Sequence, residues 1–92
     1  MDFERKGNWI FKRGKGGDVI AEVTFPALRD GVVVIDHTFV DNSLRGQGIA
    51  SELVEAAYEA IKADGKKATL TCPYAVKWFD DRPEKKDIVI GA

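Results

Sequence analysis

The sequence has few of the residues that hold metals, disulfides or nucleic acids. Cys72 is the only cysteine, so no disulfide can form within the chain. His37 is the only histidine, and one histidine with one cysteine supplies too few ligands for a metal site. The net charge of −1 provides no basic stripe of the kind that binds nucleic acid. We therefore expect neither a bound metal nor a nucleic-acid partner.

Long hydrophobic runs and secretion signals are also missing. No apolar stretch approaches the roughly 20 residues that span a bilayer. Residues 1–4 do not begin a signal peptide, because a basic segment followed by a long apolar one is absent. A lone cysteine is usual in a reducing compartment. These absences predict a cytoplasmic protein that has no membrane partner.

What is present fits one small folded domain. The chain is too short for two domains, so we expect residues 1–92 to form a single unit. Hydrophobic residues make up 45% of the chain and charged residues 32%, a balance that favours a globular protein over a disordered one. We expect this domain to be a monomer or a weak dimer.

Three β-strands are predicted in the first half of the chain. Apolar residues 9–12 and 19–25 flank a turn at residues 14–18, which contains three glycines and an aspartate. Trp9 is expected in the core of the first strand. Residues 32–40 are rich in valine and isoleucine, which is typical of a central strand. The three strands predict an antiparallel meander.

A long amphipathic helix is predicted to begin at Ile49. Apolar side chains recur at three- and four-residue spacing as far as Ile61, and Asp64-Gly65 ends the pattern. Residues 68–72 then predict a fourth strand. The order strand, helix, strand implies a right-handed crossover and a parallel pair.

The C-terminal part predicts two shorter elements. Proline at the first position favours a short helix over residues 73–79, which Arg82-Pro83 ends. Trp78 and Phe79 on this helix are expected to pack on the sheet, with an adenine or substrate contact as the alternative. Residues 87–90 predict a terminal strand. The predicted fold is α/β (α+β), in which the antiparallel three-stranded meander precedes a helix crossover to a parallel fourth strand and a short C-terminal helix.

The most informative motif lies where the long helix begins. It consists of Arg45-Gly46-Gln47-Gly48-Ile49-Ala50. The first N–H groups of a helix have no partner within it, and glycines allow a ligand to approach the main chain closely. With an arginine beside them, such amides are suited to a pyrophosphate.

Three other interpretations of this motif were weighed. The simplest is a tight turn that only reverses the chain. A dinucleotide-binding fingerprint is disfavoured because Ser51 replaces its third glycine and the chain lacks the length for two mononucleotide halves. A phosphate-binding P-loop is excluded because its glycine–lysine–serine or –threonine pattern is absent.

The spacing Arg45-x-x-Gly48-x-Ala50 resembles the signature of the GCN5-related N-acetyltransferase superfamily. The segments His37-Thr38-Phe39-Val40 and Thr71-Cys72-Pro73-Tyr74 stand in the order found in its small, single-domain branch. The resemblance covers about residues 37–83 and implies a site for acetyl-coenzyme A. It implies that residues 45–50 cradle the pyrophosphate. It also implies that the strands on either side of the helix splay apart, with the main chain of Phe39 and Val40 binding the pantetheine arm.

Cys72 and His37 are the candidate catalytic residues. The proline after Cys72 favours an extended conformation, and a position just before a helix favours a thiolate. The resemblance places Cys72 near the thioester, although a buried, inert cysteine is the alternative. His37 could remove a proton from an amine or from Cys72, whereas a packing role is the commoner fate of a lone histidine on a strand. The superfamily's tyrosine that protonates the departing thiolate corresponds weakly to Tyr74.

The acceptor is expected to be an amine. Larger members of the superfamily carry about two helices between their first strands, but residues 11–19 leave room only for a turn. An open, shallow cleft is therefore expected, which suits a protein or polyamine amine. The predicted function is acetyl-coenzyme A-dependent N-acylation of an unidentified amine. The alternatives are a non-catalytic module that binds coenzyme A and a small interaction domain without a cofactor.

Overall fold

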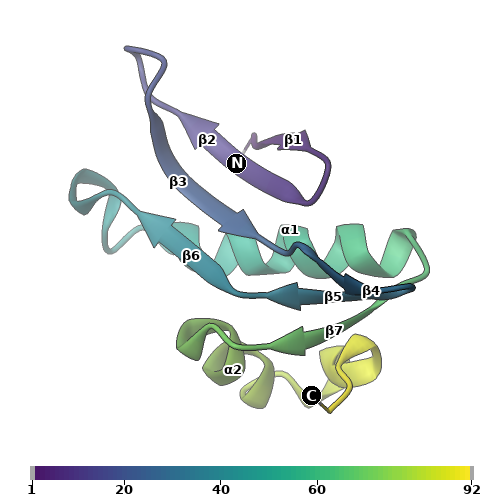
Figure 1. Ribbon diagram of the computed structural model, residues 1–92. Helices are drawn as coiled ribbons and strands as arrows, with labels where there is room; N and C mark the ends of the chain where they lie inside the picture. The colour runs from purple at the N-terminus through teal and green to yellow at the C-terminus, as the bar shows by residue number, and fades with distance from the viewer. Residues whose placement is uncertain (1, 92) are drawn as a thin grey trace.

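Two small β-sheets and two helices make up the computed structural model, which describes residues 2–91. The first sheet has the strand order β1-β2-β3-β6, and the second has the order β4-β5-β7 (Figure 1). The strands are β1 (Glu4–Lys6), β2 (Trp9–Arg13), β3 (Val19–Thr24), β4 (Ala27–Arg29), β5 (Val32–Ile35), β6 (His37–Val40) and β7 (Lys67–Leu70). The helices are α1 (Ile49–Ala63) and α2 (Pro73–Asp80), with short 3₁₀ turns η1 (Asn42–Leu44) and η2 (Pro83–Ile88).

The α/β fold expected from the sequence is confirmed. β2, β3 and β6 form the antiparallel meander, and α1 leads from them to β7. β7 runs parallel to β5, as the strand–helix–strand order predicted. The short α2 follows directly.

Residues 32–40, predicted as one strand, form two strands, β5 and β6, and this difference affects the site. β5 pairs with β7, whereas β6 pairs with β3 in the other sheet. The break falls at Asp36, next to Ile35, whose carbonyl accepts hydrogen bonds from the amides of both Thr71 and Cys72. β6 belongs to the first sheet, whereas β5 and β7 belong to the second, so the two sheets part at Asp36.

Other elements differ from the sequence predictions at the two ends of the chain. The exposed, fully charged β1 was not predicted, and it forms because Gly7, at φ 55°, turns the chain back onto β2. The terminal strand predicted over residues 87–90 was wrong. Pro83 instead starts η2, and only a single bridge from Val89 to Ala68 adds to the sheet.

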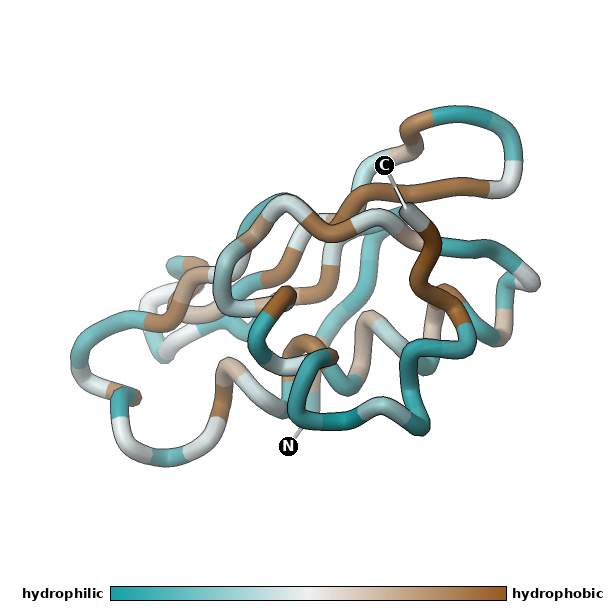
Figure 2. The backbone as a smooth tube through the Cα atoms, turned by 90° about the horizontal axis from the view of Figure 1, so that it is seen from below, coloured by the Kyte–Doolittle hydropathy of each residue, from teal (hydrophilic) through white to brown (hydrophobic). Residues whose placement is uncertain are grey.

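A single apolar cluster joins α1 to both sheets. α1 lies behind the strands in Figure 1 and contacts β2, β3, β6 and β7. Its fully buried side chains include Ile49, Leu53 and Ile61, each of which stabilises the fold by roughly 1.5–3 kcal/mol. Seen from below in Figure 2, the protruding loops are mainly hydrophilic. Within residues 2–91, neither helix is long and apolar enough to span a membrane.

α2 is fixed beside the first turn of α1. The Nε1 of Trp78 donates to Ser51 Oγ at 2.9 Å, and the guanidinium of Arg82 lies 4.3 Å from the Trp78 ring centroid. Trp78 and Phe79 are buried, which confirms the packing role predicted for them. These contacts hold the C-terminal half of α2 close to the start of α1.

Candidate functional site

Two glycines shape the chain where α1 begins. Gly46 and Gly48 adopt φ values of 84° and 73°, in the left-handed region that side chains disfavour. A Cβ added at either position would meet no other atom within 4 Å. The glycines therefore satisfy a backbone requirement and leave open space above the main chain.

The first amides of α1 have no partner in the helix. Gly48 is the N-cap, and it provides no side chain to accept a hydrogen bond. The first helical bond runs from the amide of Glu52 to the carbonyl of Gly48 at 3.1 Å. The amides of Ile49, Ala50 and Ser51 precede it, so they remain available to an acceptor from outside the chain. The helix dipole adds partial positive charge at the same place.

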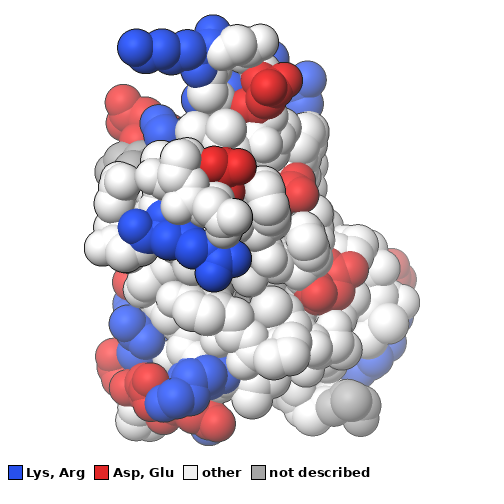
Figure 3. Space-filling view, turned by 90° about the vertical axis from the view of Figure 1, so that its left-hand side faces the viewer, with Lys and Arg blue, Asp and Glu red and all other residues white. Residues whose placement is uncertain are grey.

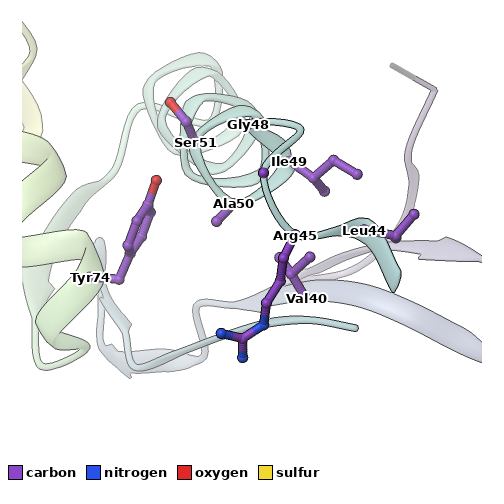
Figure 4. A pocket seen from close by; sticks show the side chains of 9 residues that line it. Val40, Leu44, Arg45, Gly48, Ile49, Ala50, Ser51 and Tyr74 are labelled. Carbon is purple, nitrogen blue, oxygen red and sulfur yellow. The ribbon is translucent and has the colours of Figure 1, made fainter. Parts of the chain in front are cut away.

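A pocket of about 430 Å³ lies over this helix start. It is lined by Val40, Leu44, Arg45, Gly46, Gly48, Ile49, Ala50, Ser51 and Tyr74. Figure 4 shows Arg45 and Tyr74 on either side of the first turn of α1. The pocket thus combines bare amides, a cation and an aromatic ring.

The side chain of Arg45 carries a positive charge that has no ion-pair partner among the described residues. Its side chain is exposed and makes no ion pair or hydrogen bond with any residue from 2 to 91. Figure 3, which looks onto the end of the molecule where the β6–α1 loop lies, shows a group of basic atoms within a largely uncharged surface. An unpaired guanidinium beside a helix N-terminus is well suited to phosphate oxygens.

Asp41 fixes the loop that carries Arg45. Its carboxylate accepts hydrogen bonds from Ser43 Oγ at 2.6 Å and from Ser43 N at 3.0 Å. These two bonds lower the pKa of Asp41, so the loop is held by an ionised carboxylate at neutral pH. The amide of Asp41 also donates to the carbonyl of Ile20, which ties the loop to β3.

Most of the predicted coenzyme-binding residues meet at this pocket. Those that line it are Val40, Arg45, Gly46, Gly48, Ile49, Ala50 and Tyr74. The side chain of Ile49 is only 1% exposed and belongs to the core, so this residue can offer only its amide. Gln47 and Phe39 are exposed but lie outside the pocket lining.

β6 is an edge strand of the first sheet, so one of its edges has no neighbouring strand in that sheet. The amide of Asp41 donates to β3, and the direction of the main-chain groups alternates along an antiparallel strand. The same alternation turns the N–H and C=O of Phe39 toward β3. It leaves those of Thr38 and Val40 on the open edge. The structure therefore favours Thr38 and Val40, rather than Phe39 and Val40, as main-chain partners for an extended ligand.

Cys72 lies where the two sheets part. It is the N-cap of α2 and has the extended conformation predicted for a residue before proline. Its side chain is 6% exposed, and its Sγ lies 3.5 Å from Oγ1 of Thr38. Cys72 belongs to the apolar core and does not line the pocket.

His37 lies on the opposite face of β6 from Thr38. Its side chain is half exposed, and its Nε2 lies 3.2 Å from Glu22 Oε2. The structure shows no hydrogen bond between His37 and Cys72, because strand residues alternate between the two faces. Thr38 and Glu22 were not predicted as site residues from the sequence. Strand parity could have pointed to Thr38, whereas Glu22 depends on the strand register.

The described residues offer no metal centre. Within residues 2–91, no three side chains among histidine, cysteine, aspartate and glutamate are grouped so that they could hold a metal ion.

The chain is similar to several known proteins. A family profile described as GCN5-related N-acetyl-transferase matches residues 9–88. Protein NATD1 from Homo sapiens is 38% identical over 83 residues, which cover 90% of this chain and 74% of the human protein. The solution structure of a GCN5-like protein from Staphylococcus aureus superposes with a TM-score of 0.80 at 23% identity, over 99% of this chain and 89% of that one. An acetyltransferase of the GNAT family from Staphylococcus aureus Mu50 gives a TM-score of 0.62 at 13% identity, over 82% and 50% of the two chains. The two structural likenesses concern the fold.

Proposed function

Because the chain belongs to the GCN5-related N-acetyltransferase family, we propose that it transfers an acetyl group from acetyl-coenzyme A to a primary amine. The observation that carries the proposal is the pocket at the start of α1. There, three amides without helical acceptors lie beside the unpaired guanidinium of Arg45. Both features attract an anion.

The coenzyme pyrophosphate is proposed to bind at residues 45–50. Gly46 and Gly48 leave open space above their Cα atoms, so phosphate oxygens can reach the amides directly. Arg45 can contact a second oxygen with its planar guanidinium. The ring of Tyr74, 39% exposed at the edge of the pocket, offers a flat surface beside this position.

The pantetheine arm is proposed to run along the open edge of β6. The main-chain groups of Thr38 and Val40 can pair with its amides in the manner of an added strand. This path leads from the pocket toward Cys72, where the sheets part. When bound, acetyl-coenzyme A supplies an acetyl group on a thioester, and an edge amide of β6 can donate to the carbonyl oxygen.

The amine has to lose a proton before it can attack. An alkylammonium with a pKa of about 10.4 is almost fully protonated at pH 7, and freeing its lone pair costs about 4–5 kcal/mol. His37 is the proposed base, because its imidazole is half exposed on the face of β6 that α1 does not cover. Cys72 is proposed to position this region. Its burial and its contact with Thr38 favour direct transfer over an acetylated thiol.

Release of free coenzyme A tests the proposal. The protein is incubated with acetyl-coenzyme A and a panel of primary amines, and the new thiol is quantified against reactions without amine. Amine-dependent release is expected, with loss of release in His37→Ala. Binding of coenzyme A without release would instead identify a non-catalytic module, and the absence of binding would identify an interaction domain.

A further inference from the structure

We propose that the carboxylate of Glu22 is the site that binds the ammonium group of the acceptor. Glu22 lies on the face of the first sheet that is turned away from α1. This inference rests on the proposed function, because it assigns the acceptor to a position beside the proposed base.

The strand register brings aromatic residues around Glu22. Glu22 pairs with Phe11 on one side and with Phe39 on the other, so all three side chains share one face. Trp9 shares this face and stacks on Phe11, with ring centroids 3.9 Å apart. Contrary to its expected place in the core, Trp9 is only half-buried, and Phe39 is 41% exposed. An aromatic surface therefore surrounds a carboxylate on an open sheet face.

Glu22 is held in place from two sides. Trp9 Nε1 donates to its Oε1 at 2.8 Å, and His37 Nε2 lies 3.2 Å from its Oε2. Its side chain is 25% exposed, less than every other carboxylate that forms an ion pair among residues 2–91. The carboxylate is thus oriented and partly desolvated.

Glu22 also lacks a permanent counter-charge in the described chain. Each of the other ion-paired carboxylates has a lysine or arginine partner, whereas the partner of Glu22 is a histidine. A histidine, unlike a lysine or an arginine, carries no permanent positive charge. A partly buried carboxylate without a fixed cation favours a cationic ligand, since burial of an unpaired charge is costly.

A primary alkylammonium fits this position best. It is a compact charge with three donors, and Glu22 has a lone pair left on each oxygen after its contacts with Trp9 and His37. The exposed faces of Trp9 and Phe39 can add cation–π attraction. A guanidinium would need both carboxylate oxygens in one plane, and these already serve two different partners.

The position of His37 links this site to the thioester. His37 directly follows Asp36, where the sheets part, and precedes Thr38, whose main chain lies on the open edge. When Nε2 of His37 is unprotonated, an ammonium that lies beside Oε2 of Glu22 can also donate to Nε2, which takes its proton. The N–H bond of the ammonium breaks, an Nε2–H bond forms, and the lone pair remains on the amine for attack at the acetyl carbonyl. The resulting imidazolium is stabilised by Glu22.

Binding can be followed without turnover through the indole N–H of Trp9, which donates to Glu22. The NMR signal of this proton is monitored while Nα-acetyl-lysine methylamide or spermidine is added, to distinguish a lysine side chain from a polyamine. The matched uncharged ligand is the lysine compound acetylated at Nε. A saturable shift is expected with the ammonium ligands. The uncharged ligand should bind about tenfold more weakly, or cause no shift.

Two variants locate the effect. Glu22→Gln keeps an acceptor for Trp9 and removes the charge, and it should weaken ammonium binding about tenfold or more. Glu4→Gln removes a carboxylate from the same sheet and face that already pairs with Arg13, and it should bind as the wild type does. In turnover, Glu22→Gln should raise the KM for the amine while the Kd for coenzyme A stays unchanged.

The inference is overturned if neither ammonium ligand shifts the Trp9 signal, or if Glu22→Gln binds them as tightly as the wild type. It is also overturned if the uncharged ligand binds equally well. Failure of the proposed function would be seen separately, as a wild-type protein that does not bind coenzyme A. A protein that binds coenzyme A and releases it with amines, yet shows no effect of Glu22→Gln, would refute only the site assigned here.

Discussion

Thr38 and Cys72 connect the two sheets at the point where they part, with Oγ1 of Thr38 3.5 Å from Sγ of Cys72. The contact joins a residue of the edge strand β6 to the N-cap residue of α2. It lies where the pantetheine arm is proposed to end. The thiol therefore has a structural partner, which bears directly on its chemical role.

Cys72→Ala is expected to retain amine-dependent release of coenzyme A. In the wild type, Cys72 is 6% exposed and its thiol contacts Thr38. In direct transfer the thiol forms no bond to the acetyl group, so Cys72 is needed only to position the chain between β7 and α2. Intact mass spectrometry after incubation with acetyl-coenzyme A should show no acetyl adduct on the wild type. An adduct that Cys72→Ala lacks, together with loss of release in that variant, would establish an acetylated cysteine intermediate instead.

Gly48→Ala is expected to weaken coenzyme A binding more than it weakens the fold. Its φ of 73° makes alanine unfavourable by about 1–2 kcal/mol, and its Cβ would enter the open space of the pocket. Gly65, at the other end of α1, has a φ of 70° and equally open surroundings, so Gly65→Ala is a matched control. Denaturation should show similar losses for both variants, and calorimetry should show weaker binding only for Gly48→Ala. Equal affinities in the two variants would argue against close approach at Gly48.

Arg45→Glu is expected to weaken coenzyme A binding by more than about tenfold, since it replaces an attractive charge with a repulsive one. The fold should be little affected, because the side chain of Arg45 makes no ion pair or hydrogen bond with the described residues. Arg29→Glu, on exposed β4, changes the net charge equally and should bind normally. Equal losses in both variants would indicate a general charge effect rather than a contact at Arg45.

Acid should destabilise the protein through Asp87. The hydrogen bond from Lys62, with a further one from Tyr58, holds the pKa of this carboxyl below its ordinary value. Ionised Asp87 therefore favours the folded state above the unfolded pKa of about 3.9, and this contribution is lost as the pH falls through the lower folded pKa. The urea midpoint should fall between about pH 5 and about pH 3, and fall less in Asp87→Asn. Asp30→Asn, at an exposed turn without an ion pair to another described residue, should behave as the wild type does. An unchanged pH profile in Asp87→Asn would contradict this assignment.

The parts of the fold that depend on local signals could be predicted from the sequence. The spacing of apolar residues defined α1, and Gly65 marked its end through a left-handed turn. The break at Asp36 could not be predicted, because the carbonyl of Ile35 is shared by amides that follow it by more than thirty residues. β1 could not be predicted either, since its three charged residues form a strand only by pairing with β2.

In the candidate site too, the features set by neighbouring residues could be predicted, whereas those set by strand pairing could not. The helix start and the pocket beside it could be predicted because glycines, an arginine and an amphipathic pattern stand together in the sequence. The neighbours of Glu22 could not, because they depend on the register across three strands, including an irregularity between Lys12 and Arg13. His37 was identified as a candidate from its residue type and from the resemblance to the family, and its partner Glu22 came only from the structure.

The most direct test is calorimetric titration of the wild-type protein with coenzyme A and, separately, with pantetheine, which lacks the pyrophosphate. If bare amides and Arg45 bind the pyrophosphate, coenzyme A should bind at least about a hundredfold more tightly, the equivalent of two charge-assisted contacts. Equal affinity for the two compounds, or no heat with either, would contradict the assignment of the α1 N-terminus as the coenzyme site.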